Sequence, residues 1–114
     1  MNGFYVVYYT GKTGSGFAII VFRDGIITGA DASGGLYDGK YTVSEDKRGL
    51  EGTIVMTVPP GVSLVTGAPI SQVSYTQQFP ISLSLDTDQN QPLRLQTPSG
   101  PINLNLKKLR DFAD

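Results

Sequence analysis

Residues 3–46 decide the fold of this chain, and they read GFYVVYYTGKTGSGFAIIVFRDGIITGADASGGLYDGKYTVSED. Runs rich in β-branched and aromatic residues alternate here with turns that contain glycine. The four runs are Phe4–Thr10, Phe17–Phe22, Ile26–Ala30 and Leu36–Val43. Such runs are typical of strands, and glycine supplies the positive φ angles that tight reversals need. The segment therefore predicts an antiparallel meander of four strands.

The rest of the chain continues this pattern. Apolar and polar residues alternate at 50–58, which predicts a fifth strand that ends at Pro59, and a long connection then runs to Gln72. The clearest alternation occupies 73–85, where Pro80 lacks an N–H for the ladder and so favours a bulge, an edge or a bend. We interpret Pro80 as the point where a long strand curves. Two further strands are predicted around 93–95 and 102–106, with turns at 86–90 and 97–101.

Eight predicted strands with mostly short connections favour one fold. Eight up-and-down antiparallel strands make the smallest sheet that closes into a barrel with room for side chains or a small ligand, and closure removes the exposed edges. A two-sheet sandwich would need crossovers, for which only the connection after Pro59 is long enough. The sequence therefore predicts an all-β, eight-stranded antiparallel up-and-down barrel, as a single domain over residues 1–114.

Composition excludes several classes of function. The chain has no histidine and no cysteine, so histidine-dependent triads, thiolate metal sites and disulfides are excluded. The formal net charge of −1 removes the main driving force for direct nucleic-acid binding. We therefore expect a cytoplasmic protein with no cofactor. No convergent acid–base pair can be identified, so we expect no enzymatic activity. The N-terminus has no basic segment before an apolar stretch, so we expect no signal peptide and no membrane segment.

The predicted barrel interior is a candidate ligand site. Along the fourth strand Gly39 lies between the inward-facing Tyr37 and Tyr41, which leaves a gap for a ligand or a neighbouring ring. A carrier or sensor of a small apolar molecule would line its cavity with Tyr37, Tyr41, Ile54, Met56, Tyr75, Phe79, Ile81 and Leu83. The alternative is ordinary cross-strand packing of these side chains.

Several polar motifs are better explained by structure than by chemistry. Asp24-Gly25 is typical of a hairpin turn, and Asp31 is more often a turn former than a catalytic group. The glycine-rich segment 11–16 joins two strands, so it lacks the helix that a phosphate-binding loop requires. Asp86 and Asp88 lack the glycine and the distal glutamate of a calcium loop, which favours a solvated turn.

A family resemblance is carried by five motifs in the first part of the chain. They are Gly3-Phe4-Tyr5-Val6-Val7, Gly16 with Ile19-Ile20-Val21, Asp24-Gly25-Ile26-Ile27-Thr28-Gly29-Ala30-Asp31, Tyr37-Asp38-Gly39 and Ser44-Glu45-Asp46. In order and spacing they resemble the GrlR family of negative regulators of type III secretion. Beyond Leu50 only the strand pattern agrees.

The resemblance implies a small lipocalin-like barrel that forms a homodimer, has an apolar interior and is not an enzyme. It also implies regulation by protein contact, in which an acidic surface loop takes part in binding a helix-turn-helix transcription activator. Glu45 and Asp46 match the first two acidic positions of that loop, whereas Lys47 and Arg48 carry the opposite charge. These four residues are the expected partner-binding site, for a different partner or alongside a different surface.

Two hypotheses follow from the sequence. The leading one is a non-enzymatic regulatory or interaction protein that acts through protein contacts. The competing one is a carrier or sensor of a small apolar molecule, and both could hold if a ligand controlled the partner surface.

Overall fold

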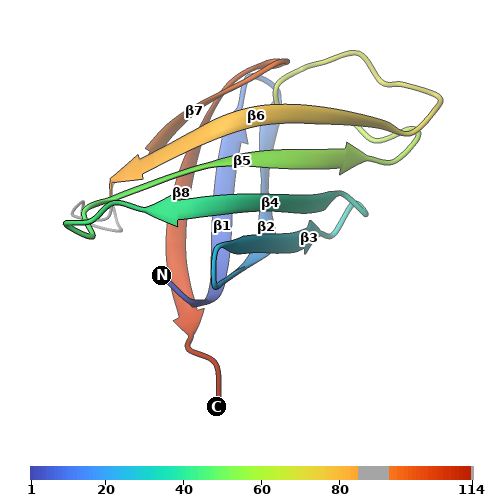
Figure 1. Cartoon of the computed structure of the whole chain (residues 1–114). Coiled ribbons are helices and arrows are strands. Elements are labelled where there is room, and N and C mark those ends of the chain that lie inside the picture. The colour runs from blue at the N-terminus through green and yellow to red at the C-terminus, as the bar shows by residue number, and fades with distance from the viewer. Residues whose placement is uncertain (85–92, 114) are drawn as a thin grey trace.

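The computed structural model describes residues 1–84 and 93–113, which form an all-β, nearly closed barrel (Figure 1). The eight strands are β1 (Gly3–Gly11), β2 (Gly14–Arg23), β3 (Ile26–Asp31), β4 (Leu36–Val43), β5 (Gly49–Val58), β6 (Tyr75–Ser84), β7 (Leu93–Thr97) and β8 (Gly100–Arg110). They are antiparallel and lie in the order β6-β5-β4-β3-β2-β1-β8-β7. The predicted fold class and up-and-down order are confirmed.

The strand bounds differ from the prediction at a few points. β8 continues to Arg110, which pairs with Phe4 beyond a register shift between Phe4 and Tyr5. Val73 belongs to the predicted sixth strand, but it precedes β6 in the structure and is 68% exposed. The predicted turn at 86–90, with Asp86 and Asp88, lies outside the described residues.

A seam between β6 and β7 interrupts the barrel, since these strands share no hydrogen-bonded ladder in the described part of the chain. The amide of Gln77 on β6 donates a hydrogen bond to the hydroxyl of Ser99, next to β7, and so bridges the seam. Pro80 lies on β6 opposite Thr53 with no register shift. Of the three alternatives predicted for Pro80, the structure therefore contains the edge strand, where a missing N–H is tolerated.

Two hairpins reverse by different means. Asp24 and Gly25 have φ angles of 49° and 84°, as in a type I′ turn, which confirms the predicted hairpin. The β1–β2 hairpin turns instead at Lys12-Thr13, and neither these residues nor Gly11, Gly14 and Gly16 have a positive φ. The expectation that glycines supply positive φ angles in this first turn is therefore wrong.

One end of the barrel interior is filled by aromatic rings. Phe22 packs edge-on against Tyr5 and Tyr41, with ring centroids 5.2 and 5.5 Å apart. Leu50 and Ile27 are fully buried beside this group. The three strands β1, β2 and β4 thus meet at a packed aromatic centre.

Close backbone approach explains Gly39 on β4. A Cβ atom at this position would collide with the carbonyl oxygen of Thr53 on β5. The gap predicted between Tyr37 and Tyr41 is therefore occupied by the backbone of the next strand. Gly52 has the same relation to the carbonyl oxygen of Lys40, so the two strands approach closely at both glycines.

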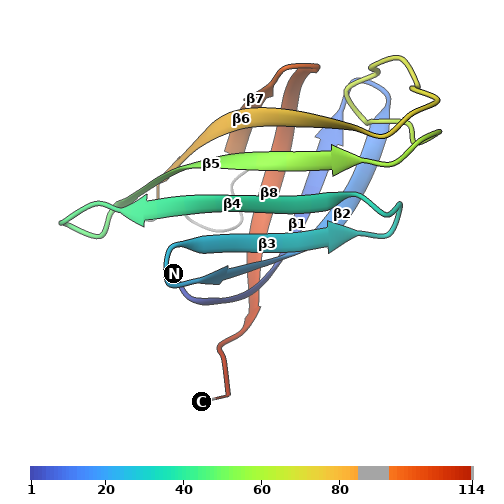
Figure 2. The same ribbon diagram turned by 45° about the vertical axis from the view of Figure 1, so that its right-hand side comes forward.

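The long connection 59–74 between β5 and β6 lies beside the β1–β2 turn in both ribbon views (Figures 1 and 2). The Thr13 N–H donates to the Val65 carbonyl at 2.9 Å, and the Thr13 hydroxyl contacts the carbonyls of Leu64 and Val65 at 3.2 and 3.1 Å. The connection is thereby fixed over one mouth of the barrel.

Candidate ligand cavity

The barrel interior contains a cavity of about 300 Å³ that extends from the connection 59–74 to Phe22 and Leu83. Its walls are inward-facing side chains from strands all around the barrel, and Val62–Thr66 of the connection lines its end. Most of this lining is hydrocarbon, including Val7, Ala18 and Leu106. The cavity is therefore an apolar space inside the antiparallel wall.

The connection packs closely against the end of β1. A Cβ atom at Gly11 would collide with the carbonyl oxygen of Val65, so only glycine allows the two segments to approach this closely. Thr66 also lines the cavity, and its Oγ1 atom is buried without a hydrogen-bond partner in the described part of the chain. Such an atom is costly unless something else satisfies it.

A polar cluster borders the cavity at the β3–β4 turn. Asp31 Oδ1 accepts the backbone N–H groups of Ser33 and Gly35, both at 2.9 Å, which is the turn-forming role predicted for Asp31. Its other oxygen accepts the Tyr37 hydroxyl at 2.7 Å. Tyr9 on β1 is hydrogen-bonded to Tyr37 in turn. One carboxylate and two phenols are thus linked along the wall.

Burial raises the pKa of both phenols in this cluster. For Tyr37 the hydrogen bond to Asp31 adds to the effect of burial and raises the pKa far above its usual value. For Tyr9 burial is again the largest cause of the raised pKa, followed by the negative charge of Asp31. Both phenols therefore remain protonated hydrogen-bonding groups throughout the neutral pH range.

The structure places six of the eight predicted cavity residues around this space: Tyr37, Ile54, Met56, Phe79, Ile81 and Leu83. Tyr41 and Tyr75 are not among the lining residues. Tyr41 has the inward parity, but it belongs to the aromatic centre at the other end, where its hydroxyl lies 3.3 Å from Asn2 Oδ1. Tyr75 begins β6 opposite Val58.

Sequence reasoning missed most of the residues that line the cavity. Val7 and Tyr9 face the interior of the barrel, and the alternation of residues along β1 could have predicted this. Gln77 also occupies an inward-facing position of β6, but its polar side chain gave no reason to expect it in the wall of an apolar cavity. The positions of Asp31 and Thr66 at the cavity could not be predicted from alternation, because Asp31 lies at the β3–β4 turn and Thr66 lies in the connection between β5 and β6.

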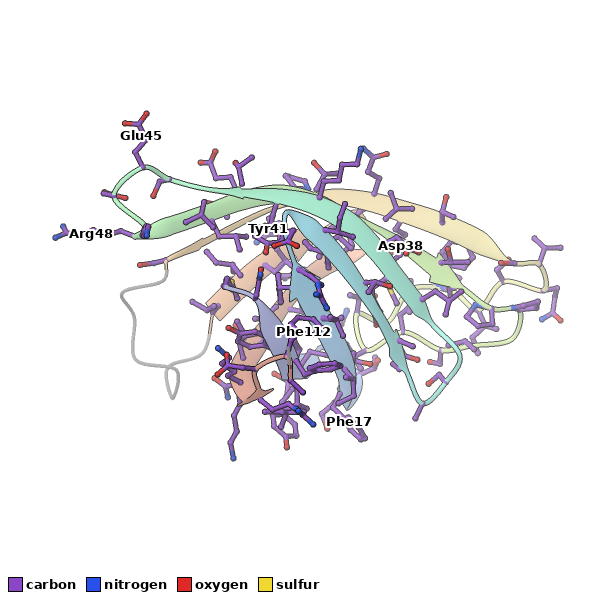
Figure 3. All side chains as sticks on the ribbon, turned by 60° about the horizontal axis from the view of Figure 1, so that its bottom comes forward. Phe17, Asp38, Tyr41, Glu45, Arg48 and Phe112 are labelled. Carbon is purple, nitrogen blue, oxygen red and sulfur yellow. The ribbon has the colours of Figure 1, made fainter. Side chains whose placement is uncertain are left out.

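The β4–β5 loop with the four predicted partner-binding residues lies at the barrel end opposite the connection 59–74. Asp46 Oδ1 accepts the Ser44 hydroxyl at 2.5 Å and the Arg48 N–H at 3.0 Å, and these bonds lower the pKa of Asp46, the Ser44 bond most. Lys47 has a φ of 59°. Figure 3 shows Glu45 and Arg48 pointing away from the barrel at the loop tip. Asp46 therefore shapes the turn, while Glu45 faces solvent.

A second feature is an apolar surface on the outside of β1, β2 and β4. Tyr8, Phe17, Ile19 and Leu36 are exposed by 52%, 50%, 38% and 49%, and we call these four residues the outer apolar face. Tyr8 and Phe17 pair across β1 and β2, with ring centroids 6.3 Å apart. Contiguous exposed hydrophobic residues are uncommon on monomeric soluble proteins.

No cluster of three or more metal-ligating side chains occurs in residues 1–84 and 93–113. In the same residues no helix is long and apolar enough to cross a membrane. The chemistry that the cavity offers is burial of hydrocarbon beside one hydrogen-bonded polar cluster.

Comparison of the chain with protein-family models gives no match, and a search of curated proteins gives no significant match either. The resemblance to the GrlR family consequently stays a prediction from sequence.

Proposed function

We propose that this chain is a non-enzymatic binding protein that takes up one small apolar molecule inside its barrel. The cavity is the observation that carries the proposal. Its volume of about 300 Å³ lies at the lower end of the range for small-molecule sites, and its wall is mainly hydrocarbon. A ligand that buries roughly 250 Å² of apolar surface gains about 6 kcal/mol, which corresponds to micromolar rather than nanomolar affinity.

A neutral fluorescent probe tests this proposal directly. The chain contains no tryptophan, so N-phenyl-1-naphthylamine can be titrated without interfering emission. We expect saturable binding of one probe per chain, with an emission increase typical of an apolar site. Absence of saturable binding to the folded protein would contradict the proposal.

A matched pair of variants locates the probe. Ala18 is buried and lines the cavity, whereas Ala30 is exposed on the neighbouring strand β3. Ala18→Leu fills part of the cavity and should weaken probe binding by about tenfold, which is about 1.4 kcal/mol. Ala30→Leu adds the same atoms outside and should leave binding unchanged.

We also propose regulation through protein contact, with a homodimer formed through the outer apolar face. Four large side chains without charge lie together there, and burying such a surface against a second copy removes it from water. We expect sedimentation equilibrium to give a dimer. Ile19→Lys should shift it to monomer, and Thr42→Lys, which introduces the same charge at an exposed position of β4, should not.

The β4–β5 loop is the proposed contact with a cytoplasmic protein partner, such as the helix-turn-helix regulator implied by the family resemblance. Glu45 is the side chain to reverse, because Asp46 holds the turn and its replacement would also change the loop's shape. A partner captured from the native extract should be lost with Glu45→Lys. Unchanged capture would make the loop a turn only.

A further inference from the structure

We propose that an open groove on the outside of the barrel, beside the connection 59–74, binds sugar phosphates. The groove has a volume of about 660 Å³ and is formed by the β1–β2 turn, by residues around the β7–β8 turn and by residues 66–69 of the connection. These three segments lie together at the top of both ribbon views (Figures 1 and 2). Thr66 is the one described residue that lines both this groove and the apolar cavity, so the groove is a separate site.

Strand register builds the floor of the groove. Thr10 on β1 pairs with Asn103 on β8, and Asn103 also pairs with Arg94 on β7. Side chains of directly paired residues lie side by side on one face of a sheet. All three residues are exposed, whereas their neighbours Tyr9 and Leu95 line the cavity, so this face is the outer one. A hydroxyl, an amide and a guanidinium thus form one row across the outer wall.

The groove is cationic. Arg94 lies on its floor, and Lys12 lies in the β1–β2 turn with its Cδ atom beside Gly67 of the connection. Among the described residues no aspartate or glutamate lines the groove, and the side chains of Lys12 and Arg94 have no ion-pair or hydrogen-bond partner. Two such cations along one groove favour a ligand with more than one negative charge. A phosphate monoester is nearly doubly charged at neutral pH, and a guanidinium can bind it through two parallel hydrogen bonds.

The other lining groups favour a sugar as the rest of the ligand. The groove is much larger than a phosphate ion, so a bound phosphate leaves room for the molecule that carries it. No aromatic side chain lines the groove in the described part of the chain, and a nucleobase would therefore have no ring on which to stack. Thr10, Ser99 and Asn103 instead offer hydroxyl and amide groups, which can both donate and accept hydrogen bonds. Sugar hydroxyls do the same, so a sugar phosphate matches the charge and the polarity of the groove.

Three related ligands test the proposal on the full-length chain. Ribose 5-phosphate contains the proposed chemistry, ribose lacks the phosphate, and adenosine monophosphate adds a base to the same sugar phosphate. NMR titration of the amide signals measures each Kd. We expect ribose 5-phosphate to bind with a Kd of about 1 mM or below, because charge pairs in an open groove are partly screened by water and salt. Ribose should not bind measurably, and adenosine monophosphate should bind no more tightly than ribose 5-phosphate.

Variants of the two cations locate the ligand. Arg94→Gln should weaken binding of ribose 5-phosphate by about tenfold, because it removes the paired donors of the guanidinium. Lys12→Gln should weaken it by about threefold, since lysine acts as a single point charge in an exposed position. Lys107→Gln is the matched control, because it removes the same charge from the exposed face of β8 outside the groove and should leave the Kd unchanged. All three side chains are exposed, so the variants should fold like the wild type.

Several results would overturn the proposal. Ribose 5-phosphate might give no saturable shift, or Arg94→Gln might bind it as tightly as the wild type does. Tenfold tighter binding of adenosine monophosphate would assign the groove to nucleotides, and equally tight binding of inorganic phosphate would make it a site for simple anions. The neutral probe tests the cavity separately, so none of these results bears on the proposed binding of an apolar molecule.

Discussion

The two ends of the barrel interior are built by the same strands but packed in opposite ways. Where β1 pairs with β2, the inward side chains of β2 shrink from Phe22 and Ile20 to Ala18 and Gly16. Phe22 and Ala18 both border the cavity, but Phe22 also packs against the rings of Tyr5 and Tyr41, whereas Ala18 leaves space. The difference shows that side-chain size along one strand, and not strand pairing, determines where this barrel is solid and where it is hollow.

The largest expected effect is the loss of a ring from the packed end. Phe22→Ala should lower the free energy of unfolding by about 3–4 kcal/mol, because Phe22 is 3% exposed and its removal leaves a cavity among Tyr5 and Tyr41. Met56→Ala at the hollow end, where Met56 pairs with Tyr37, should cost only about 1–2 kcal/mol, since Met56 is partly exposed and already borders empty space. Urea unfolding measures both, and equal losses would mean that the ends are packed alike.

The sequence predicted the walls of the barrel better than its filling. Alternation follows from the pleat of a strand, so the strand positions and six cavity residues could be inferred from parity alone. Tyr37 and Tyr41 have the same parity, however, although Tyr37 lines the cavity and Tyr41 belongs to the aromatic centre. The parity of a residue shows which face of the sheet its side chain occupies. It does not show how far along the barrel axis that side chain lies.

The polar cluster and the cover could not be predicted because both depend on contacts between distant segments. Tyr9 meets Tyr37 only when β1 and β4 curve around one interior. The connection after β5 covers the cavity because Thr13 binds Leu64 and Val65, about fifty residues further along the chain. The turn-forming role predicted for Asp31 is also what orients its second oxygen toward Tyr37.

The next prediction concerns the glycine between the two ends. Gly39→Ala should destabilise the fold by about 2 kcal/mol, because the new Cβ meets the backbone carbonyl of Thr53, which cannot move without disturbing β5. Gly14→Ala is the control, since a Cβ there has no neighbour within 4 Å. Thermal unfolding should separate the two variants by several degrees. A tolerated Gly39→Ala would show that the close approach of β4 and β5 does not need glycine.

Alkaline pH should weaken the hollow end through Tyr37. Its folded-state pKa is raised, first by burial and then by the bond to Asp31, whereas the unfolded chain ionises near pH 10. The folded state therefore keeps a proton that the unfolded state loses, so this contribution is fully present below about pH 10 and decreases above it. The slope is about 1.4 kcal/mol per pH unit for one retained proton. Tyr37→Phe should reduce the slope of the free energy of unfolding between about pH 10 and 11 by that amount, and an unchanged slope would contradict the assignment.

The smallest effect is expected from filling the hollow end. Ala18 pairs with Val7 on one side and Asp31 on the other, and it is buried against the cavity, so Ala18→Val adds two methyl groups where space exists. We expect the free energy of unfolding to rise by about 0.5–1 kcal/mol, as cavity-filling substitutions commonly give.

Ala30→Val on the exposed face controls for the higher strand propensity of valine, which both variants gain. Chemical denaturation should then show Ala18→Val to be more stable than Ala30→Val without added ligand. If Ala18→Val is instead the less stable of the two, the wall around Ala18 is rigid and close-packed, and the difference between the two ends is smaller than the cavity volume suggests.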